Sequence, residues 1–172
     1  MDNRPTPEGF TLVELIIVII ILGIVSTFAA SRFMGTSHFS AFTAQEQIIS
    51  VIRQVQVNRI QTNIPNLYNY CNDTSNLDLQ KLCLRSRITT NARCIGSSSG
   101  CSASDSNARS DVVIADQVSF STTPSVSQIT FDLLGNPLGT ASNGVSILIS
   151  AGQSQADVCI NSQGYVRKGR CQ

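Results

Sequence analysis

The sequence contains no tryptophan, a single histidine and few charged residues, and each shortage narrows the range of functions. Charged residues make up 13% of the chain and nearly cancel, which leaves a net charge of +1. The chain therefore has no overall field that would draw it to nucleic acid or to an anionic membrane. Any such binding must come from a local cluster of charges.

Catalytic residues are also scarce. Residues 96–100 read GSSSG and fit the G-x-S-x-G pattern of serine hydrolases, but we predict neither a strand before them nor a helix after them. The one histidine, His38, lies far away in a segment with helical periodicity. We interpret residues 96–100 as a loop bounded by cysteines, and we expect neither enzymatic activity nor a cofactor.

Cysteine is missing from the first 70 residues, and all six cysteines follow in the rest of the chain. An even number confined to one region is typical of disulfides formed outside the cytoplasm. No two cysteines have the C-x2-C spacing of zinc sites, so we expect no metal. Among the fifteen possible pairings, we favour neighbours in the sequence, because each pair closes a short loop in a polar region: Cys71–Cys83, Cys94–Cys101 and Cys159–Cys171.

Charge is nearly absent from the segment Phe10 to Ala30, in which Glu14 is the only charged side chain. A helix of this length covers about 30 Å, which is the thickness of a bilayer core. The apolar run exceeds the 7 to 15 residues or so of a signal-peptide core, and residues 1–9 are not basic overall. We therefore predict a transmembrane helix.

Helical periodicity continues after this segment and stops before Pro65, which disfavours helical geometry at the preceding residue. Apolar residues recur at helical spacing at Phe42, Ile48, Ile49, Ile52, Val55 and Ile60. This pattern predicts one long helix whose first half is apolar all round and whose second half is amphipathic. Two helices divided near Gly35 are the alternative.

The periodicity changes beyond Pro65. We interpret residues 66–110 as a long loop region with one short strand at residues 87–90, held by two disulfides. Strand patterns then follow at residues 111–114, 117–121, 128–133, 144–150, 157–161 and 164–167. Short connections predict an antiparallel meander. The predicted fold class is α+β, with a long N-terminal helix packed on an antiparallel sheet and disulfide-pinned loops.

The segment GFTLVELIIVIIILG, residues 9–23, resembles the N-terminus of type IV pilins and of the pseudopilins of type II secretion. The resemblance implies that a prepilin peptidase cleaves after Gly9 and that Phe10 becomes the N-methylated first residue. It also implies that Glu14 pairs with the terminal amine of a neighbouring subunit during assembly. Residues 1–9 would be the leader, residues 10–35 the transmembrane and polymerisation helix, and residues 36–172 the periplasmic or extracellular domain.

Two later segments, ITFDLLGNPLG and NSQGYVRKGRC, are similar to the F-D-x-x-G-x-P and G-[RY] elements of H-type pseudopilins and FimT-like pilus proteins. Taken whole, the chain most resembles minor pilins of the mannose-sensitive haemagglutinin class, the MshC type. This resemblance implies a type IV pilus subunit with an adhesive role, held first in the inner membrane by a single pass and then present at the cell surface. The implied partners are other pilins, the peptidase and the inner-membrane assembly platform. An H-type pseudopilin of type II secretion and a DNA-binding minor pilin are the alternatives.

A basic cluster near the C-terminus contains Arg167, Lys168 and Arg170. FimT-like proteins are associated with DNA uptake through a basic G-R-x-R tail, and this chain ends instead in Gly-Arg-Cys-Gln. Three cations would give a weak, salt-sensitive contact with phosphates. We favour the alternative, a solvated strand edge that discourages aggregation, over nucleic-acid binding.

Overall fold

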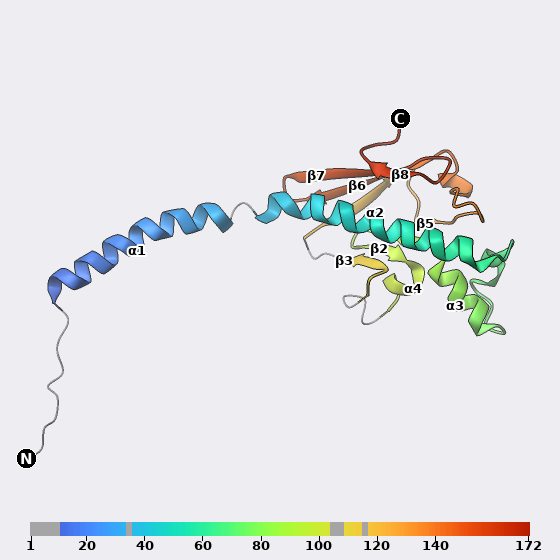
Figure 1. Ribbon diagram of the computed structural model, residues 1–172, viewed down its shortest axis with the longest axis horizontal. Helices are drawn as coiled ribbons and strands as arrows, with labels where there is room; N and C mark the ends of the chain where they lie inside the picture. Colours follow the sequence, from blue (N-terminus) through green and yellow to red (C-terminus); the bar gives the residue numbers. More distant parts are fainter. Residues whose placement is uncertain (1–10, 34–35, 104–108, 115–116) are drawn as a thin grey trace, which may run out of the picture. The chain divides into compact units, whose positions relative to one another are not determined.

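The computed structural model describes residues 11–33, 36–103, 109–114 and 117–172 (Figure 1). The chain divides into two compact units, one ending at Thr36 and the other running from Ser37 to Gln172. The cleavage and methylation residues, Gly9 and Phe10, lie outside the described residues.

The first unit contains helix α1 (Leu12–Phe33). Its start is capped by Thr11, whose side-chain oxygen accepts a hydrogen bond of 3.3 Å from the backbone N–H of Glu14. The side chains of α1 are exposed from Leu12 to Phe28. Among the residues that the structure describes, no helix combines the length and the apolar character needed to cross a membrane. The assignment of residues 10–35 as a transmembrane helix stays a prediction.

The second unit is built around helix α2 (Thr36–Thr62). The description stops at Phe33 and resumes at Thr36, so the choice between one long helix and two helices divided near Gly35 falls on residues that lie outside the described ones. The buried positions of α2 recur mostly at steps of three or four residues: Ala41, Ala44, Gln45, Ile48, Ile49, Val51, Ile52, Val55, Gln56 and Arg59.

The prediction that Phe42 and Ile60 belong to the buried stripe of α2 was wrong, because they are 54% and 46% exposed. Polar residues occupy several inward positions instead. Gln45, for example, donates a hydrogen bond of 2.6 Å to the backbone carbonyl of Asp157. Backbone carbonyl groups around α2 therefore help to determine which of its residues face inward.

The region 66–110 is largely structured, so its prediction as a long loop was wrong. It contains η1 (Leu67–Tyr70), α3 (Leu77–Arg85), β1 (Ile88–Thr90), β2 (Cys94–Ser97) and α4 (Ser98–Cys101). Helix α3 is short, but Asn76 caps it by accepting a hydrogen bond of 3.2 Å from the N–H of Leu79. The cap and a disulfide stabilise this helix, which is too short for the sequence periodicity to predict it.

In the part of the chain that the structure describes, eight strands form two antiparallel sheets. The order in one sheet is β3 (Val112–Ile114), β2, β1 and β5 (Gln128–Ile129). The order in the other is β4 (Ser119–Thr123), β6 (Val145–Ala151), β7 (Ser154–Ile160) and β8 (Val166–Lys168). The antiparallel fold class is confirmed, but the single meander was wrong, because the chain enters the second sheet at β4 and returns to the first at β5. η3 (Gly139–Ala141) precedes β6.

The predicted strand over residues 128–133 is shorter in the structure. Regular pairing stops at Ile129, and only Phe131 continues it through an isolated bridge to Pro137. A tight turn around Asp132 begins directly afterwards and ends the strand.

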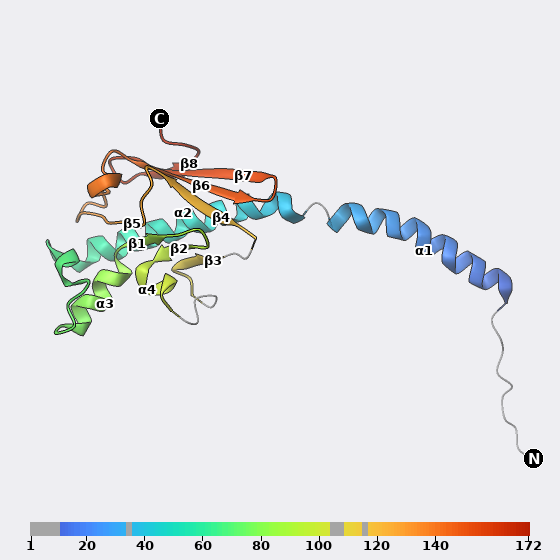
Figure 2. The same cartoon turned by 180° about the vertical axis from the view of Figure 1, so that it is seen from behind.

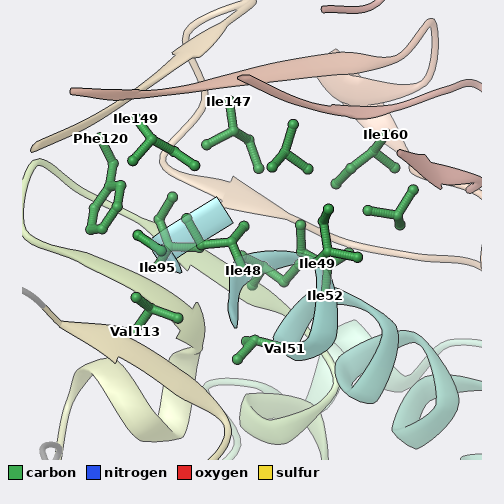
Figure 3. Packing of buried hydrophobic residues seen from close by; sticks show 14 of the residues in the cluster. Ile48, Ile49, Val51, Ile52, Ile95, Val113, Phe120, Ile147, Ile149 and Ile160 are labelled. Atoms are coloured by element: carbon green, nitrogen blue, oxygen red, sulfur yellow. The ribbon is translucent and has the colours of Figure 1, made fainter. Parts of the chain in front are cut away.

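The hydrophobic core joins α2 to both sheets. Figure 3 shows Ile48, Ile49 and Ile52 of α2 facing Ile147, Ile149 and Ile160 of the second sheet, with Ile95 and Val113 of the first sheet nearby. Strand β6 alternates buried and half-buried residues, as its sequence pattern predicts. The main cluster extends from Ala41 to Val166, so the unit that begins at Ser37 contains it entirely.

Three disulfides link neighbouring cysteines within this unit: Cys71–Cys83, Cys94–Cys101 and Cys159–Cys171. They are the same three pairs that the sequence analysis favours, and no cysteine is free. The first joins η1 to α3, the second joins β2 to α4, and the third holds the C-terminus against β7. With its own core and all three disulfides, the unit from Ser37 onward is suited to study as a soluble fragment.

Candidate functional site

The start of α1 carries the assembly residue proposed from the sequence, Glu14. Its backbone N–H is bound by Thr11, and its side chain is exposed. Among the described residues no cation lies within ion-pair distance of the Glu14 carboxylate. Sequence reasoning missed Thr11, although the S/T-x-x-E spacing from Thr11 to Glu14 is a known signal of a helix start. The carboxylate is thus left available to a group from another molecule.

The F-D-x-x-G-x-P element forms a turn held by Asp132. The Asp132 carboxylate accepts hydrogen bonds of 2.8 Å from the backbone N–H groups of Leu134 and Asn136 and from the Asn136 side chain. Burial raises the pKa of Asp132, but these donors outweigh burial and hold the pKa below its ordinary value. The motif aspartate therefore acts as a structural anchor for the turn.

Gln56 connects this turn to the loop between β7 and β8. Its side-chain amide donates to the carbonyl oxygens of Gly135, at 3.0 Å, and of Gly164, at 2.7 Å. A Cβ at Gly164, whose φ is +77°, would lie 2.1 Å from the Gly135 oxygen. The two sequence elements that resemble those of H-type pseudopilins are therefore in direct contact. The close approach requires glycine at position 164, whereas Gly135 is favoured by its φ of +87°. Sequence reasoning missed Gln56 because nothing local marks it as buried.

Arg59 lies in the last turn of α2 and is only 1% exposed. Its guanidinium donates to the carbonyl oxygens of Phe131 at 2.9 Å, Ile64 at 2.9 Å and Pro65 at 3.2 Å, and lies 5.2 Å from the ring centroid of Tyr68. All of its oxygen partners are neutral, because the remaining one is the Thr62 hydroxyl. The negative end of the helix dipole also favours a cation here. Arg59 thus joins the end of α2 to the turn that holds the F-D element.

Tyr68 gives this network a pH dependence. Burial raises the pKa of Tyr68, although its hydrogen bond with Phe131 and the nearby charge of Arg59 partly oppose the rise. The Tyr68 hydroxyl ionises near pH 10 in the unfolded chain and only at higher pH in the folded chain. The folded state therefore loses stability relative to the unfolded state as the pH rises above about 10. We expect the Tyr68→Phe fragment to be less stable than wild type at pH 8, yet to lose less stability between pH 9 and pH 11. Urea unfolding of both proteins at pH 8, pH 9 and pH 11 measures these stabilities. Equal losses of stability between pH 9 and pH 11 in the two proteins would contradict the prediction.

The basic cluster lies on β8, an edge strand of its sheet. Lys168 forms an ion pair with Glu46 of α2, and Arg170 forms one with Asp157 at 3.1 Å. Arg167 donates to the carbonyl oxygens of Lys168 and Arg170. The structure brings the three cations together but pairs two of them with carboxylates. This favours the strand-edge interpretation over a phosphate-binding site.

The GSSSG segment is a packed corner, because its first two residues end strand β2 and its last three lie in helix α4. The prediction of a loop with no strand before it and no helix after it was therefore wrong. Ser98, at the position of a hydrolase nucleophile, is 3% exposed and contacts Arg87 and Thr89 through its hydroxyl. Ser97 caps α4 by accepting from the N–H of Gly100 at 2.9 Å. These hydroxyls serve the packing of the corner. Within the described part of the chain, no group of three His, Cys, Asp or Glu side chains is placed to hold a metal ion.

Residues 7–30 match the prokaryotic N-terminal methylation motif. This motif runs into an apolar helix, and a disulfide-containing unit of antiparallel sheets around a second helix follows. The combination agrees with the fold class predicted from the sequence, a helical N-terminus followed by antiparallel sheet with disulfides. Among solved structures, the chain is similar to the type IV minor pilin FimU of Pseudomonas aeruginosa, with a TM-score of 0.47 and 10% identity over 75% of this chain and 87% of that one. A comparison with curated protein sequences gave no match.

Proposed function

We propose that the chain is a minor pilin, a non-enzymatic subunit of a type IV pilus. The match of residues 7–30 to the methylation motif carries this proposal. In it, prepilin peptidase removes residues 1–9, Phe10 is methylated, and residues 10–35 hold the chain in the inner membrane. Residues 36–172 lie on the periplasmic side until the subunit is transferred to the filament by the assembly platform.

The exposed surface of α1 supports this cycle. Its large apolar side chains from Leu12 to Phe28 are 43% to 74% exposed. Apolar surface of this extent is unfavourable in water at roughly 25 cal/mol per Å². Lipid would cover it before assembly, and the helices of neighbouring pilins would cover it in the filament.

The presence of Glu14 in the apolar segment supports a role in assembly, because a permanent membrane anchor would have no need of a carboxylate there. A carboxylate in hydrocarbon costs several kcal/mol unless it is paired. Cleavage after Gly9 creates an amine at Phe10, and a staggered neighbour would bring this amine to Glu14. The pairing makes the filament a better environment for the segment than the membrane.

The alternatives share the N-terminal segment but are less well supported by the second unit. Three disulfides suit a filament exposed outside the cell better than a pseudopilin of type II secretion. The pairing of Lys168 and Arg170 with carboxylates reduces the charge available for DNA. A role in surface attachment and membership of the MshC type remain part of the proposal.

Intact-mass spectrometry of the purified chain tests the processing step. We expect a mature chain that begins at N-methylated Phe10, and an uncleaved chain when Gly9→Val places a branched side chain at the cleavage site. Arg4→Gln is the control, because it changes the leader without touching the cleavage site. A mature chain that begins after Ala30 would indicate signal-peptide removal and contradict the proposal. Recovery of the wild-type chain in sheared filaments separates a pilus from a secretion system.

A further inference from the structure

A polar groove of about 730 Å³ runs along the second unit between α2, α3 and the segment that enters β3. Figures 1 and 2 both show α3 beside the C-terminal half of α2. The volume falls within the range of small-molecule sites, about 300 to 1,000 Å³. The proposed filament contacts and the basic cluster on β8 do not involve this groove.

One wall of the groove is a row of side-chain amides on α2. Gln54, Asn58 and Gln61 are spaced at i, i+4 and i+7, so they lie on one face with about 5 to 6 Å between neighbouring Cβ atoms. None of the three side-chain amides forms a hydrogen bond with another described residue. Each amide can both donate and accept, and so can each hydroxyl of a sugar. The wall therefore suits a ligand that carries several hydroxyl groups along its length.

The lining contributed by the segment that enters β3 includes an arginine, Arg109. Arg109 is fixed by two hydrogen bonds to Asp111, Nε to Oδ1 at 2.8 Å and a terminal nitrogen to Oδ2 at 2.7 Å. Burial raises the pKa of Asp111, but the bonds from Arg109 and Ser97 outweigh burial and keep the pKa below its ordinary value. Asp111 therefore neutralises Arg109 and holds it in place.

Arg85, at the end of α3, differs from Arg109 because no described carboxylate pairs with it. It is exposed and is one of the residues that line the groove. A guanidinium binds a planar carboxylate through two parallel hydrogen bonds. The groove thus combines one uncompensated site for an anion with a row of hydroxyl-binding amides.

We propose that this groove binds an acidic saccharide, with a sugar carboxylate at Arg85 and sugar hydroxyls along Gln54, Asn58 and Gln61. Single-stranded nucleic acid is less suitable, because such sites combine several cations with aromatic platforms, and the residues that line the groove include no aromatic. The inference goes beyond the proposed pilus role and concerns only the second unit. If the groove did not bind a saccharide, the predictions on leader cleavage and on assembly would still stand.

Titration of the soluble fragment that starts at Ser37 tests the inference. The probe is trigalacturonate, and the matched neutral trisaccharide is maltotriose. We expect saturable shifts in the side-chain NH₂ signals of Gln54, Asn58 and Gln61 in ¹H–¹⁵N spectra with trigalacturonate, and much weaker ones with maltotriose. The absence of saturable shifts at about 10 mM trigalacturonate, far above a useful dissociation constant, would overturn the proposal.

Variants identify the residues that bind. Arg85→Gln should weaken binding of trigalacturonate at least about tenfold, because it removes a charge-assisted pair of hydrogen bonds. Arg93→Gln is the control, since Arg93 is also exposed but does not line the groove. Equal affinities of the two variants would contradict the site. Tighter binding of a ten-nucleotide thymidine strand, with the same dependence on Arg85, would overturn the choice of ligand in favour of nucleic acid.

Discussion

Replacing Glu14 with alanine is expected to lower incorporation of the chain into filaments at least about tenfold, while the chain accumulates in the membrane. The carboxylate is exposed at the start of α1 and has no cation near it among the described residues. An unpaired carboxylate is unfavourable in lipid, and a subunit that pairs it with the amine of a neighbour recovers much of this cost. Alanine removes both the cost of remaining in the membrane and the gain from assembly. Immunoblots of sheared filaments and of membranes measure the two pools.

The matched control for Glu14→Ala is Asp78→Asn, which removes an exposed carboxylate from α3 in the second unit. Its incorporation should equal that of wild type. Glu14→Gln separates charge from hydrogen bonding, and it should behave like Glu14→Ala if pairing with an amine is the reason for the residue. Normal filament levels of Glu14→Ala would contradict the assembly role.

Replacing Arg59 with methionine is expected to destabilise the second unit by about 3 kcal/mol or more, a large part of the 5 to 15 kcal/mol or so that holds a domain folded. Methionine has a similar length but cannot donate to the carbonyl oxygens of Ile64, Pro65 and Phe131. The main costs are the lost hydrogen bonds, of which the one to Phe131 is buried, and the lost positive charge at the end of α2. Urea unfolding of the disulfide-intact fragment from Ser37 measures the change.

Arg53→Met is the matched control, because Arg53 is on the same helix, is exposed, and makes one hydrogen bond of 3.1 Å to the carbonyl oxygen of Val166. We expect it to cost less than about 1 kcal/mol. Arg59→Lys should be intermediate, since an ammonium keeps the charge at the helix end but cannot reach the same set of oxygens. Equal midpoints for Arg59→Met and Arg53→Met would show that the buried network is not an anchor.

The parts of the fold that follow from local patterns could be predicted. Strand β6 alternates along seven residues, and the helices preceding Pro65 are long enough for periodicity to be clear. The antiparallel pairing follows from short connections. The N-terminal motif identified Glu14 because its spacing from Gly9 is characteristic, whereas Thr11 required attention to a second, overlapping pattern.

The features that could not be predicted depend on distant partners. Gln45, Gln56 and Arg59 face inward because carbonyl groups more than 70 residues away in sequence accept their hydrogen bonds. Phe42 and Ile60 lie outside this inward stripe of α2 and are 54% and 46% exposed. Strand β2 contains glycine and serine and gives almost no strand signal, yet it pairs on both sides. The groove combines residues from three segments, so no single stretch of sequence indicates it.

The local disulfides have a consequence for how the chain acquires them. Cys71 and Cys83 are separated by 12 positions, and Cys94 and Cys101 by 7. Cys83 lies about as far from Cys94 as from Cys71, so loop-closure entropy hardly distinguishes these two partners in a complete reduced chain. When the chain is delivered from its N-terminus, however, Cys83 meets Cys71 before Cys94 arrives. Directional delivery to an oxidising compartment would therefore select the native pairs in order, whereas oxidation of the full-length reduced chain allows Cys83 and Cys94 to compete.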